Sequence, residues 1–268
     1  MSEYKIGFIG AGNMGSAMMQ GILAAGLCEK SEMIASCHSD ATKGRVEKQL
    51  GIRVTLDNRE ASNAHIVFLA VKPYQLSGVV SDIKDSLPAD TLVISVVAGK
   101  TLKQLAELLG EDKHIVRSMP NTPAMVGQAM SALCPGDLVT EDECKTAEKL
   151  FESFGQAEVV TEDLMDVVTG VSGSSPAFVY MIIEAMADAA VAEGMQRGAA
   201  YKFAAQSLLG SAKMVLDTGK HPGELKDAVT SPGGTTIAGV AALEAKGLRS
   251  TMIEGVRAAV QKSRDMSR

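Results

Sequence analysis

The chain of 268 residues has no tryptophan, and its aromatic side chains are six phenylalanines and four tyrosines. It also has no basic stripe, since the net charge is −6 and the isoelectric point is about 5.3. Nucleic-acid binding uses clustered Lys and Arg, often interleaved with aromatic side chains, and anionic membranes attract basic segments. We therefore expect neither a nucleic-acid partner nor a membrane partner.

Cysteines are few and unclustered, with neither CxxC spacing nor the Cys/His spacing of a metal site. The four histidines are scattered in the same way, without metal or triad spacing. No basic and apolar signal segment begins the sequence. We expect no metal, reduced thiols and a cytoplasmic location. The cysteines are Cys28, Cys37, Cys134 and Cys144.

Long uncharged apolar runs are also missing. The longest apolar stretch, residues 176–195, carries Glu184, Asp188 and Glu193, and a bilayer tolerates such charges only at a high cost. We expect this stretch to be a buried helix of a soluble protein. The composition, 46% hydrophobic and 22% charged, is ordinary for a globular chain of one large or two modest domains.

A glycine-rich turn lies near the N-terminus, between a strand candidate at residues 4–9 and a helix candidate at residues 16–23. In dinucleotide-binding folds the first glycine makes a tight turn, the second admits the pyrophosphate, and the third lets helix and strand pack closely. The order of strand, turn and helix favours a cofactor site over a simple packing turn. The predicted cofactor residues in this turn are Gly10, Ala11, Gly12, Asn13, Met14 and Gly15.

Strands and helices alternate through the first part of the chain. Residues 65–71 and 91–97 are continuous apolar runs with β-branched side chains, as in parallel strands covered on both faces. The pattern predicts an α/β fold with a Rossmann-type, doubly wound, mainly parallel sheet over residues 1–161. Ligands bind at the carboxyl ends of such strands, where the predicted cofactor residues are Ala70, Val71, Lys72, Pro73, Ala98, Gly99 and Asn121. Lys72 has an alternative interpretation as a solvated loop residue.

The expected second strand, residues 32–35, is not followed by the Asp or Glu that holds the ribose 2′-hydroxyl of NAD. Cys37 and Ser39 occupy this region, and two basic residues follow a turn later. Such donors suit the 2′-phosphate of NADPH, whereas the nearby Asp40 keeps NADH as an alternative.

After Thr161 no convincing strand remains, and the pattern predicts an all-helical domain over residues 162–268. Ala, Gly, Ser and Met are abundant in these helices, some of which are apolar on nearly every face. Helices of this kind bury their surface against a second copy, so we expect dimerisation. The helical segments are 164–171, 176–195, 199–217, 223–229, 235–245 and 250–267.

Residues 221–236 combine Pro232, Gly233 and Gly234 just before the helix candidate at 235–245. A helix start presents unpaired N–H groups and the positive end of the helix dipole, which favour a small anion. An ordinary corner between a loop and a helix is the alternative interpretation.

Five segments resemble the pyrroline-5-carboxylate reductase family in order and spacing, over essentially the whole chain. They are residues 6–15, 70–73, 119–123, 171–177 and 221–236. The resemblance implies reduction of the C=N bond of 1-pyrroline-5-carboxylate to L-proline with NADPH, the last step of proline biosynthesis. It also implies a homo-oligomer, a dimer or a decamer of five dimers, with a site built between two subunits.

The resemblance assigns roles to particular residues. The amides of Gly233, Gly234 and Thr235 would hold the substrate carboxylate, and the Thr236 hydroxyl would hydrogen-bond the ring nitrogen, which makes Thr236 the catalytic candidate. Threonine is a weak acid, so Thr236 would orient the ring and relay a proton. Further substrate contacts implied are Ser231, Ser174, Ser175 and Glu162, and Asn58 resembles a residue that meets the adenosine ribose.

Several alternatives remain at this stage. Ser174 could simply cap a helix, and Glu162 could be a solvated linker residue. β-Hydroxyacid dehydrogenases share the N-terminal pattern but usually present a lysine in the helix after a Gly-rich segment, and here no lysine follows residues 173–177 before Lys202. Another imine reductase or a non-catalytic NADPH-binding protein would also share the first half, but the latter would not need residues 231–236.

Overall fold

The computed structural model describes residues 4–267 and divides into two compact units. The first unit is Met1–Gly173 with Ala259–Arg268, and the second is Ser174–Ala258. The compact units therefore divide after Gly173, whereas the sequence predicts a boundary at residue 161, which stays a prediction.

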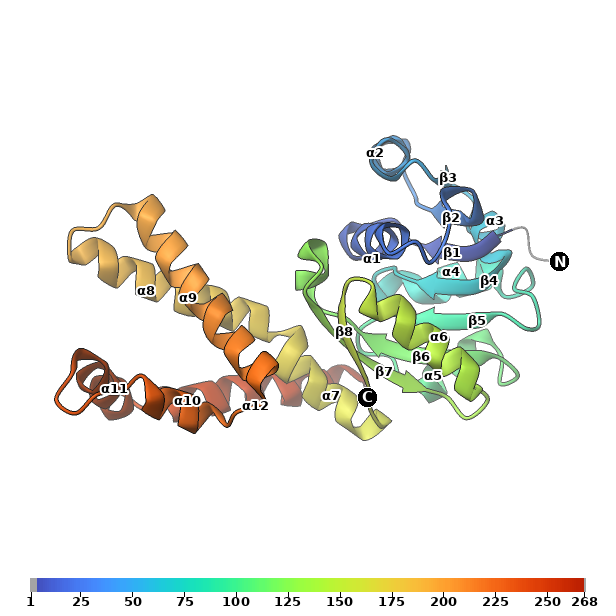
Figure 1. The fold of residues 1–268 in the computed structure, drawn as a ribbon. Helices are drawn as coiled ribbons and strands as arrows, with labels where there is room; N and C mark the ends of the chain where they lie inside the picture. Colours follow the sequence, from blue (N-terminus) through green and yellow to red (C-terminus); the bar gives the residue numbers. More distant parts are fainter. Residues whose placement is uncertain (1–3, 268) are drawn as a thin grey trace. The chain divides into compact units, whose positions relative to one another are not determined.

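An eight-stranded sheet forms the centre of the first unit, with strand order β3-β2-β1-β4-β5-β6-β7-β8 (Figure 1). All neighbouring strands pair in parallel except β6 and β7, which are antiparallel. The predicted Rossmann-type, mainly parallel sheet is thus confirmed. The strands are β1 (Tyr4–Ile9), β2 (Met33–Ser36), β3 (Arg53–Thr55), β4 (Ala64–Leu69), β5 (Leu92–Ser95), β6 (His114–Met119), β7 (Ala129–Pro135) and β8 (Gly155–Val159).

Helices cover both faces of this sheet, as its apolar strands require. In β4, Ile66 and Phe68 belong to one core cluster, and Val67 and Leu69 belong to the other. The first cluster receives side chains from α1 (Asn13–Ala24), α2 (Asp40–Leu50) and α6 (Glu141–Glu152). The second receives them from α3 (Asn58–Ser62), α4 (Leu76–Ile83) and α5 (Leu102–Leu109).

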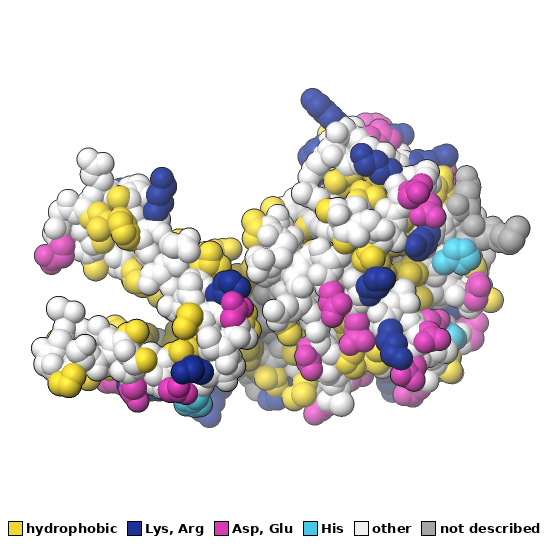
Figure 2. Space-filling model, in the orientation of Figure 1, with side chains coloured by type: hydrophobic (Ala, Val, Ile, Leu, Met, Phe, Trp, Pro, Cys, Tyr) yellow, Lys and Arg dark blue, Asp and Glu magenta, His cyan; other side chains and the backbone are white. Residues whose placement is uncertain are grey.

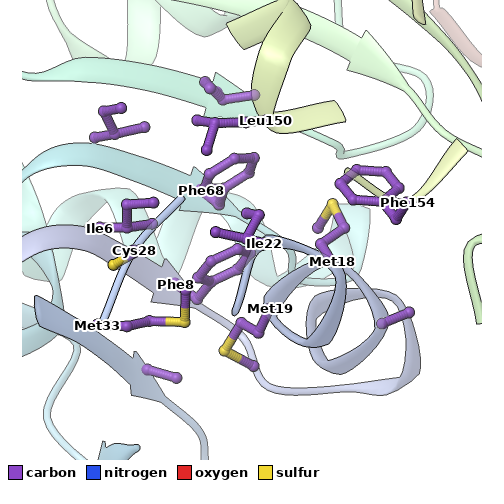
Figure 3. Close-up of a cluster of buried hydrophobic side chains, with 14 of the residues drawn as sticks. Ile6, Phe8, Met18, Met19, Ile22, Cys28, Met33, Phe68, Leu150 and Phe154 are labelled. Carbon is purple, nitrogen blue, oxygen red and sulfur yellow. The ribbon is translucent and has the colours of Figure 1, made fainter. Parts of the chain in front are cut away.

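The largest buried side chains hold α1 against the sheet. Phe8 and Phe68 stack with ring centroids 4.4 Å apart, and Met18 and Ile22 of α1 are fully buried in the same cluster (Figure 3). Burying a side chain of this size stabilises a fold by about 1.5 to 3 kcal/mol. The position of α1, and therefore of its N-terminus, is fixed by this packing.

The connections include short helical turns of other types. They are the 3₁₀ helices η1 (Lys30–Glu32), η2 (Pro73–Gln75), η3 (Thr122–Val126) and η4 (Glu162–Leu164), the short α7 (Met165–Val168), and the π-helix η5 (Thr169–Gly173). The helix expected over residues 164–171 is therefore a succession of three helical forms. A π-helix is rare and often lies at a functional site.

The second unit is entirely helical in the described residues, as predicted. It consists of α8 (Ser175–Ala192), α9 (Arg197–Thr218), α10 (Pro222–Ala228), α11 (Thr235–Ala245) and the first part of α12 (Leu248–Ser267). The last part of α12 belongs to the first unit, where the Ser263 hydroxyl donates to Asp166 Oδ1 at 2.6 Å.

The expectation of a buried helix over residues 176–195 is wrong for the single chain. Within α8 only Ala187 is buried, and Val179, Tyr180 and Met181 are exposed although α8 packs against α9. Figure 2 shows apolar side chains reaching the surface over these helices. By length and composition alone, Glu162–Ala192 would qualify as a membrane span, with a mean hydropathy of 1.3. Much of the apolar surface of α8 is therefore left uncovered by the described residues of this chain.

Candidate cofactor and substrate site

The glycine-rich turn between β1 and α1 is held by close backbone packing. Gly10 has φ +107°, and a Cβ added there would lie 2.6 Å from the Ala70 carbonyl oxygen. A Cβ added to Gly15 would lie 2.3 Å from the Gly10 carbonyl oxygen. These two glycines therefore fulfil the tight-turn and close-packing roles of a dinucleotide-binding turn.

Gly12 differs from its two neighbours in the turn. A Cβ added there would meet no atom of the described residues within 4 Å. Gly12 is also the N-cap of α1, which has no side-chain cap hydrogen bond and no acidic residue in its first turn. The first amides of α1 can therefore face an anion such as a pyrophosphate, so the residues present fit a dinucleotide cofactor.

A cavity of about 830 Å³ lies along the carboxyl ends of the strands in front of this turn. The structure brings to it most of the predicted cofactor residues, which are Gly10, Ala11, Gly12, Asn13, Met14, Cys37, Asn58, Ala70, Val71, Lys72, Pro73, Ala98 and Asn121. Gly15, Ser39 and Gly99 do not line it. Their cofactor contacts, like those of the lining residues, stay predictions.

Sequence reasoning missed other lining residues, among them His38, Leu56, Met119 and Gly173. His38 is the second residue after β2, Leu56 directly follows β3, and Met119 ends β6. Their position at the carboxyl ends of strands was a usable signal. Gly173, at the end of the π-helix, had no such signal.

Polar side chains organise the end of the cavity near β2. The Ser36 hydroxyl donates to Asn58 Oδ1 at 2.8 Å, and Arg45 donates to the Ala11 carbonyl at 3.1 Å. Ser39 caps α2 by accepting a hydrogen bond from the Thr42 amide at 3.3 Å. Cys37 is buried and its thiol faces the Ser39 carbonyl at 3.4 Å. Among the described residues, no carboxylate lines this end of the cavity.

A second cavity of about 880 Å³ adjoins the first, and both are lined by Leu56 and Asn58. The second is also lined by Asp57 and Arg59. Side-chain and backbone hydrogen bonds from Arg59 hold the pKa of Asp57 below its usual value. Asp57 therefore stays ionised and paired beside Asn58.

Glu162 has protein partners in the first unit. Its carboxylate accepts from the Leu102 amide at 2.6 Å and from Arg117 at 3.0 Å, and the Arg117 side chain is only 8% exposed. Glu162 does not line the cofactor cavity. Glu162 therefore neutralises the buried Arg117. The expected contact between Glu162 and the substrate stays a prediction.

The candidate anion site in the second unit lies at the start of α11. Gly233 has φ +66°, and the Gly234 amide donates to the Ser231 carbonyl at 3.1 Å. Gly234 is the N-cap of α11, which has no side-chain cap hydrogen bond and no acidic residue in its first turn. Thr235 and Thr236 are the first residues of this helix. The structure thus brings Ser231 and the predicted Gly-Gly-Thr-Thr run together at one helix start.

Ser174 and Ser175 lie at the start of α8, as expected from Pro176 in the first helical turn. Ser174 occupies the N-cap position of α8, as the alternative interpretation expected, but its side chain does not act as the cap. Its backbone is helical (φ −92°, ψ −27°), and it forms no side-chain cap hydrogen bond. A capping residue needs extended backbone to turn its hydroxyl towards the helix amides.

The sheet topology, the three glycines and the cavity define an NAD(P)-dependent oxidoreductase. A family model described as NADP oxidoreductase, coenzyme F420-dependent, matches residues 5–99. A second, described as pyrroline-5-carboxylate reductase dimerisation, matches residues 162–266.

Individual relatives narrow this class. A pyrroline-5-carboxylate reductase of Escherichia coli is 49% identical over 99% of both chains. Among solved structures, a pyrroline-5-carboxylate reductase from Coxiella burnetii superposes with TM-score 0.92 at 34% identity over 99% of both chains. A Plasmodium falciparum pyrroline carboxylate reductase with NADP bound gives TM-score 0.88 at 33% identity over 100% of both chains. The chain belongs to the pyrroline-5-carboxylate reductase family.

The geometry of the turn predicts that Gly12→Val weakens NADPH binding by about tenfold or more, because the side chain occupies the space for the pyrophosphate. The melting temperature should fall by only a few degrees, since the new side chain begins in open space and the loss of the glycine N-cap costs about 1 kcal/mol. Cofactor titration and thermal melting measure the two effects. Gly10→Val is the matched control, expected to destabilise the fold itself. Unchanged NADPH affinity in Gly12→Val would refute the assignment of this turn.

Proposed function

We propose that this protein reduces the C=N bond of 1-pyrroline-5-carboxylate to give L-proline, with NADPH as the preferred cofactor. The single observation that carries the proposal is the pairing of two features in one chain of this family. One is the open turn at Gly12 in front of the cofactor cavity. The other is the uncapped α11 N-terminus that begins with Gly234, Thr235 and Thr236.

NADPH, when bound, supplies the hydride. The Gly10–Gly15 turn and the α1 amides would hold its pyrophosphate, and residues at the ends of β4, β5 and β6 would lie along its nicotinamide half. The hydride adds to the imine carbon while the π electrons of the C=N bond move to nitrogen. A cyclic imine that arrives protonated as an iminium already carries the proton of the product amine, so the protein needs no strong acid.

The substrate is bound by groups of the second unit in this proposal. The amides of Gly233, Gly234 and Thr235 hold the carboxylate, because a helix start favours an anion. The Thr236 hydroxyl hydrogen-bonds the ring nitrogen, orients the ring and can relay a proton from solvent. Ser231, Ser174, Ser175 and Glu162 complete the proposed substrate contacts, as the family resemblance implies. Positioning the iminium carbon and excluding water then provide most of the rate acceleration.

Preference for NADPH follows from the end of the cavity near β2. Cys37, His38, Thr42 and Arg45 line this end, and no carboxylate of the described chain does. A 2′-phosphate would therefore meet hydrogen-bond donors and a guanidinium rather than a repelling charge. NADH use at lower efficiency is compatible with the same cavity.

We further propose a cytoplasmic homodimer, built through the helical unit, with a decamer of five dimers as the larger assembly. The exposed apolar side chains of α8 and α9, such as Tyr180, Met181 and Phe203 (60%, 67% and 70% exposed), need a cover in water. A second copy is the occupant that the dimerisation family model favours. In this arrangement the substrate residues of one subunit complete the site of its partner.

No carboxylate of the described residues lines the end of the cofactor cavity near β2. We therefore expect Ser39→Asp, which adds a negative charge there, to shift cofactor use towards NADH. Aspartate is as good an N-cap as serine, so α2 keeps its cap. The added charge should raise the KM for NADPH about tenfold, as expected for roughly 1.4 kcal/mol of repulsion, and should leave the KM for NADH nearly unchanged. Steady-state kinetics with both cofactors test this. Equal effects on both cofactors would place the 2′-phosphate elsewhere.

The role of Thr236 predicts that Thr236→Ala lowers kcat with pyrroline-5-carboxylate about tenfold or more, the value of one lost hydrogen bond of roughly 1.4 kcal/mol. Cofactor binding should be retained, and Thr236→Ser should restore most of the activity. Thr146→Ala, which removes an exposed hydroxyl on α6, is the matched control. Wild-type kcat in Thr236→Ala would contradict the assigned role, and no NADPH oxidation by the wild-type protein would contradict the proposed reaction.

The proposed interface predicts that Phe203→Glu on α9 yields monomers in light scattering and removes most of the activity, because a buried charge opposes association. Leu138→Glu is the control, since Leu138 is 47% exposed in the nucleotide-binding unit. A wild-type protein that is monomeric at assay concentration, yet active, would contradict a site shared between subunits.

A further inference from the structure

Asn121 follows β6 in the loop that lines the cofactor cavity, and it is only 9% exposed. Both polar ends of its side chain already bond to the protein. Its Nδ2 donates to the Ser172 carbonyl at 3.1 Å, and its Oδ1 accepts from the Met130 amide at 3.0 Å. Asn121 thus joins three separate segments: its own loop, strand β7 and the π-helix η5.

The carbonyl that Asn121 engages has lost its normal helical partner. In a continuous α-helix, the Ser172 carbonyl would accept a hydrogen bond from the amide of residue 176, but Pro176 has no N–H. The next amide, that of Ala177, donates instead to the Ser174 carbonyl at 3.1 Å. The asparagine amide therefore supplies the Ser172 carbonyl with a donor at the point where the helix backbone cannot.

The π-helix and the Asn121 loop form adjacent walls of the cavity. Gly173, the last residue of η5, lines the cavity together with Met119, Pro120 and Asn121. The walls are in close contact, since a Cβ added to Gly173 would lie 2.9 Å from Met119 Cε. The hydrogen bond from Asn121 to Ser172 links these two walls.

These walls lie at the half of the cavity opposite β2. In doubly wound folds, the turn after the first strand binds the pyrophosphate, the end of the second strand meets the adenosine, and the other half of the sheet receives the nicotinamide. Met119 ends β6 and Asn121 follows it, and β6 lies three strands from β1 on the side away from β2. The distance between the two walls therefore limits the positions that a nicotinamide ring could take in this half of the cavity.

We propose that Asn121 is a positioning residue for hydride transfer, which acts by tying the π-helix to the cofactor loop rather than by bonding to the cofactor. The sequence-based expectation that Asn121 binds the cofactor stays a prediction, and the proposal concerns the side chain, both ends of which bond to the protein. The proposal rests on the proposed reaction for its kinetic measurement. A displacement of about 1 Å at a reacting centre can cost about a hundredfold in rate.

Asn121→Asp is the sharpest test, because it keeps the shape and the acceptor for the Met130 amide but removes the donor to Ser172. With the carboxylate ionised, kcat should fall about tenfold to a hundredfold, while the dissociation constant of NADPH, measured without imine, should change far less. Burial raises the pKa of such a carboxyl group, and its protonated form can donate to the Ser172 carbonyl. The ratio of mutant to wild-type kcat should therefore rise as the pH falls.

Two further variants separate a positioning role from an effect of the introduced charge. Asn121→Ala introduces no charge, so it should show a loss of kcat that does not recover at low pH. Near-normal kcat in this variant would mean that the charge alone harms Asn121→Asp. Asn63→Asp makes the same chemical change at the end of α3, away from both cavities, and should leave kcat and its pH profile unchanged.

Gly173→Ala keeps the proposal falsifiable if the Asn121 variants do not fold. The added methyl group meets the flexible end of Met119, so the chain should fold while the Met119 side chain is displaced within the cavity wall, with a lower kcat and retained NADPH binding. Unaltered kcat in Gly173→Ala, or equal losses of kcat and NADPH affinity in Asn121→Asp, would overturn the proposal. Failure of the wild-type protein to reduce pyrroline-5-carboxylate would instead refute the proposed function, and NADPH titration with thermal melting would still test whether the Asn121 side chain contacts the cofactor.

Discussion

The close approach of backbone segments around Gly10 is the constraint on which the cofactor cavity depends. At this point the β1 turn lies against the Ala70 carbonyl, and Gly15 of α1 lies against Gly10, with no room for a Cβ at either glycine. α1 can therefore begin directly at the edge of the sheet, with its open N-terminus facing the cavity. The buried side chains Phe8, Met18 and Ile22 hold this arrangement (Figure 3), and packing of this density resists displacement.

Much of the first unit could be predicted because its strands are continuous apolar runs, a pattern that parallel sheets impose. β7 escaped prediction, since Ala129–Pro135 consists largely of small residues and pairs antiparallel to β6. The burial of α8 within the chain was wrongly predicted. Hydropathy shows that a helix is apolar, but it does not show whether the same chain covers its apolar faces. The hydrogen bond from Asn121 to Ser172 could not be predicted, because the two residues are separated by 51 positions in the sequence.

Residues 162–173, which include α7 and the π-helix, are held by hydrogen bonds at both ends, and their last residue lines the cofactor cavity. Asp166 of α7 accepts from Ser263 near the end of the chain, and Glu162, just before α7, neutralises the buried Arg117. These contacts fix the start of the region, whereas the Asn121 amide fixes its end at Ser172. A rare π-helix persists where surrounding contacts over-determine it, and here hydrogen bonds on both sides provide that support.

The N-termini of α1 and α11, where anions are proposed to bind, differ in their capping from the N-termini of several other helices. α2, α5 and α6 are capped by the side chains of Ser39, Thr101 and Thr140, whose oxygens satisfy a first-turn amide. α1 and α11 have glycine N-caps, no side-chain cap hydrogen bond and no acidic residue in the first turn. A glycine N-cap costs a helix only a few tenths of a kcal/mol relative to a polar cap, and it leaves these amides for a ligand. The chain thus gives up little stability at the two helix starts where a pyrophosphate and a carboxylate are proposed to bind.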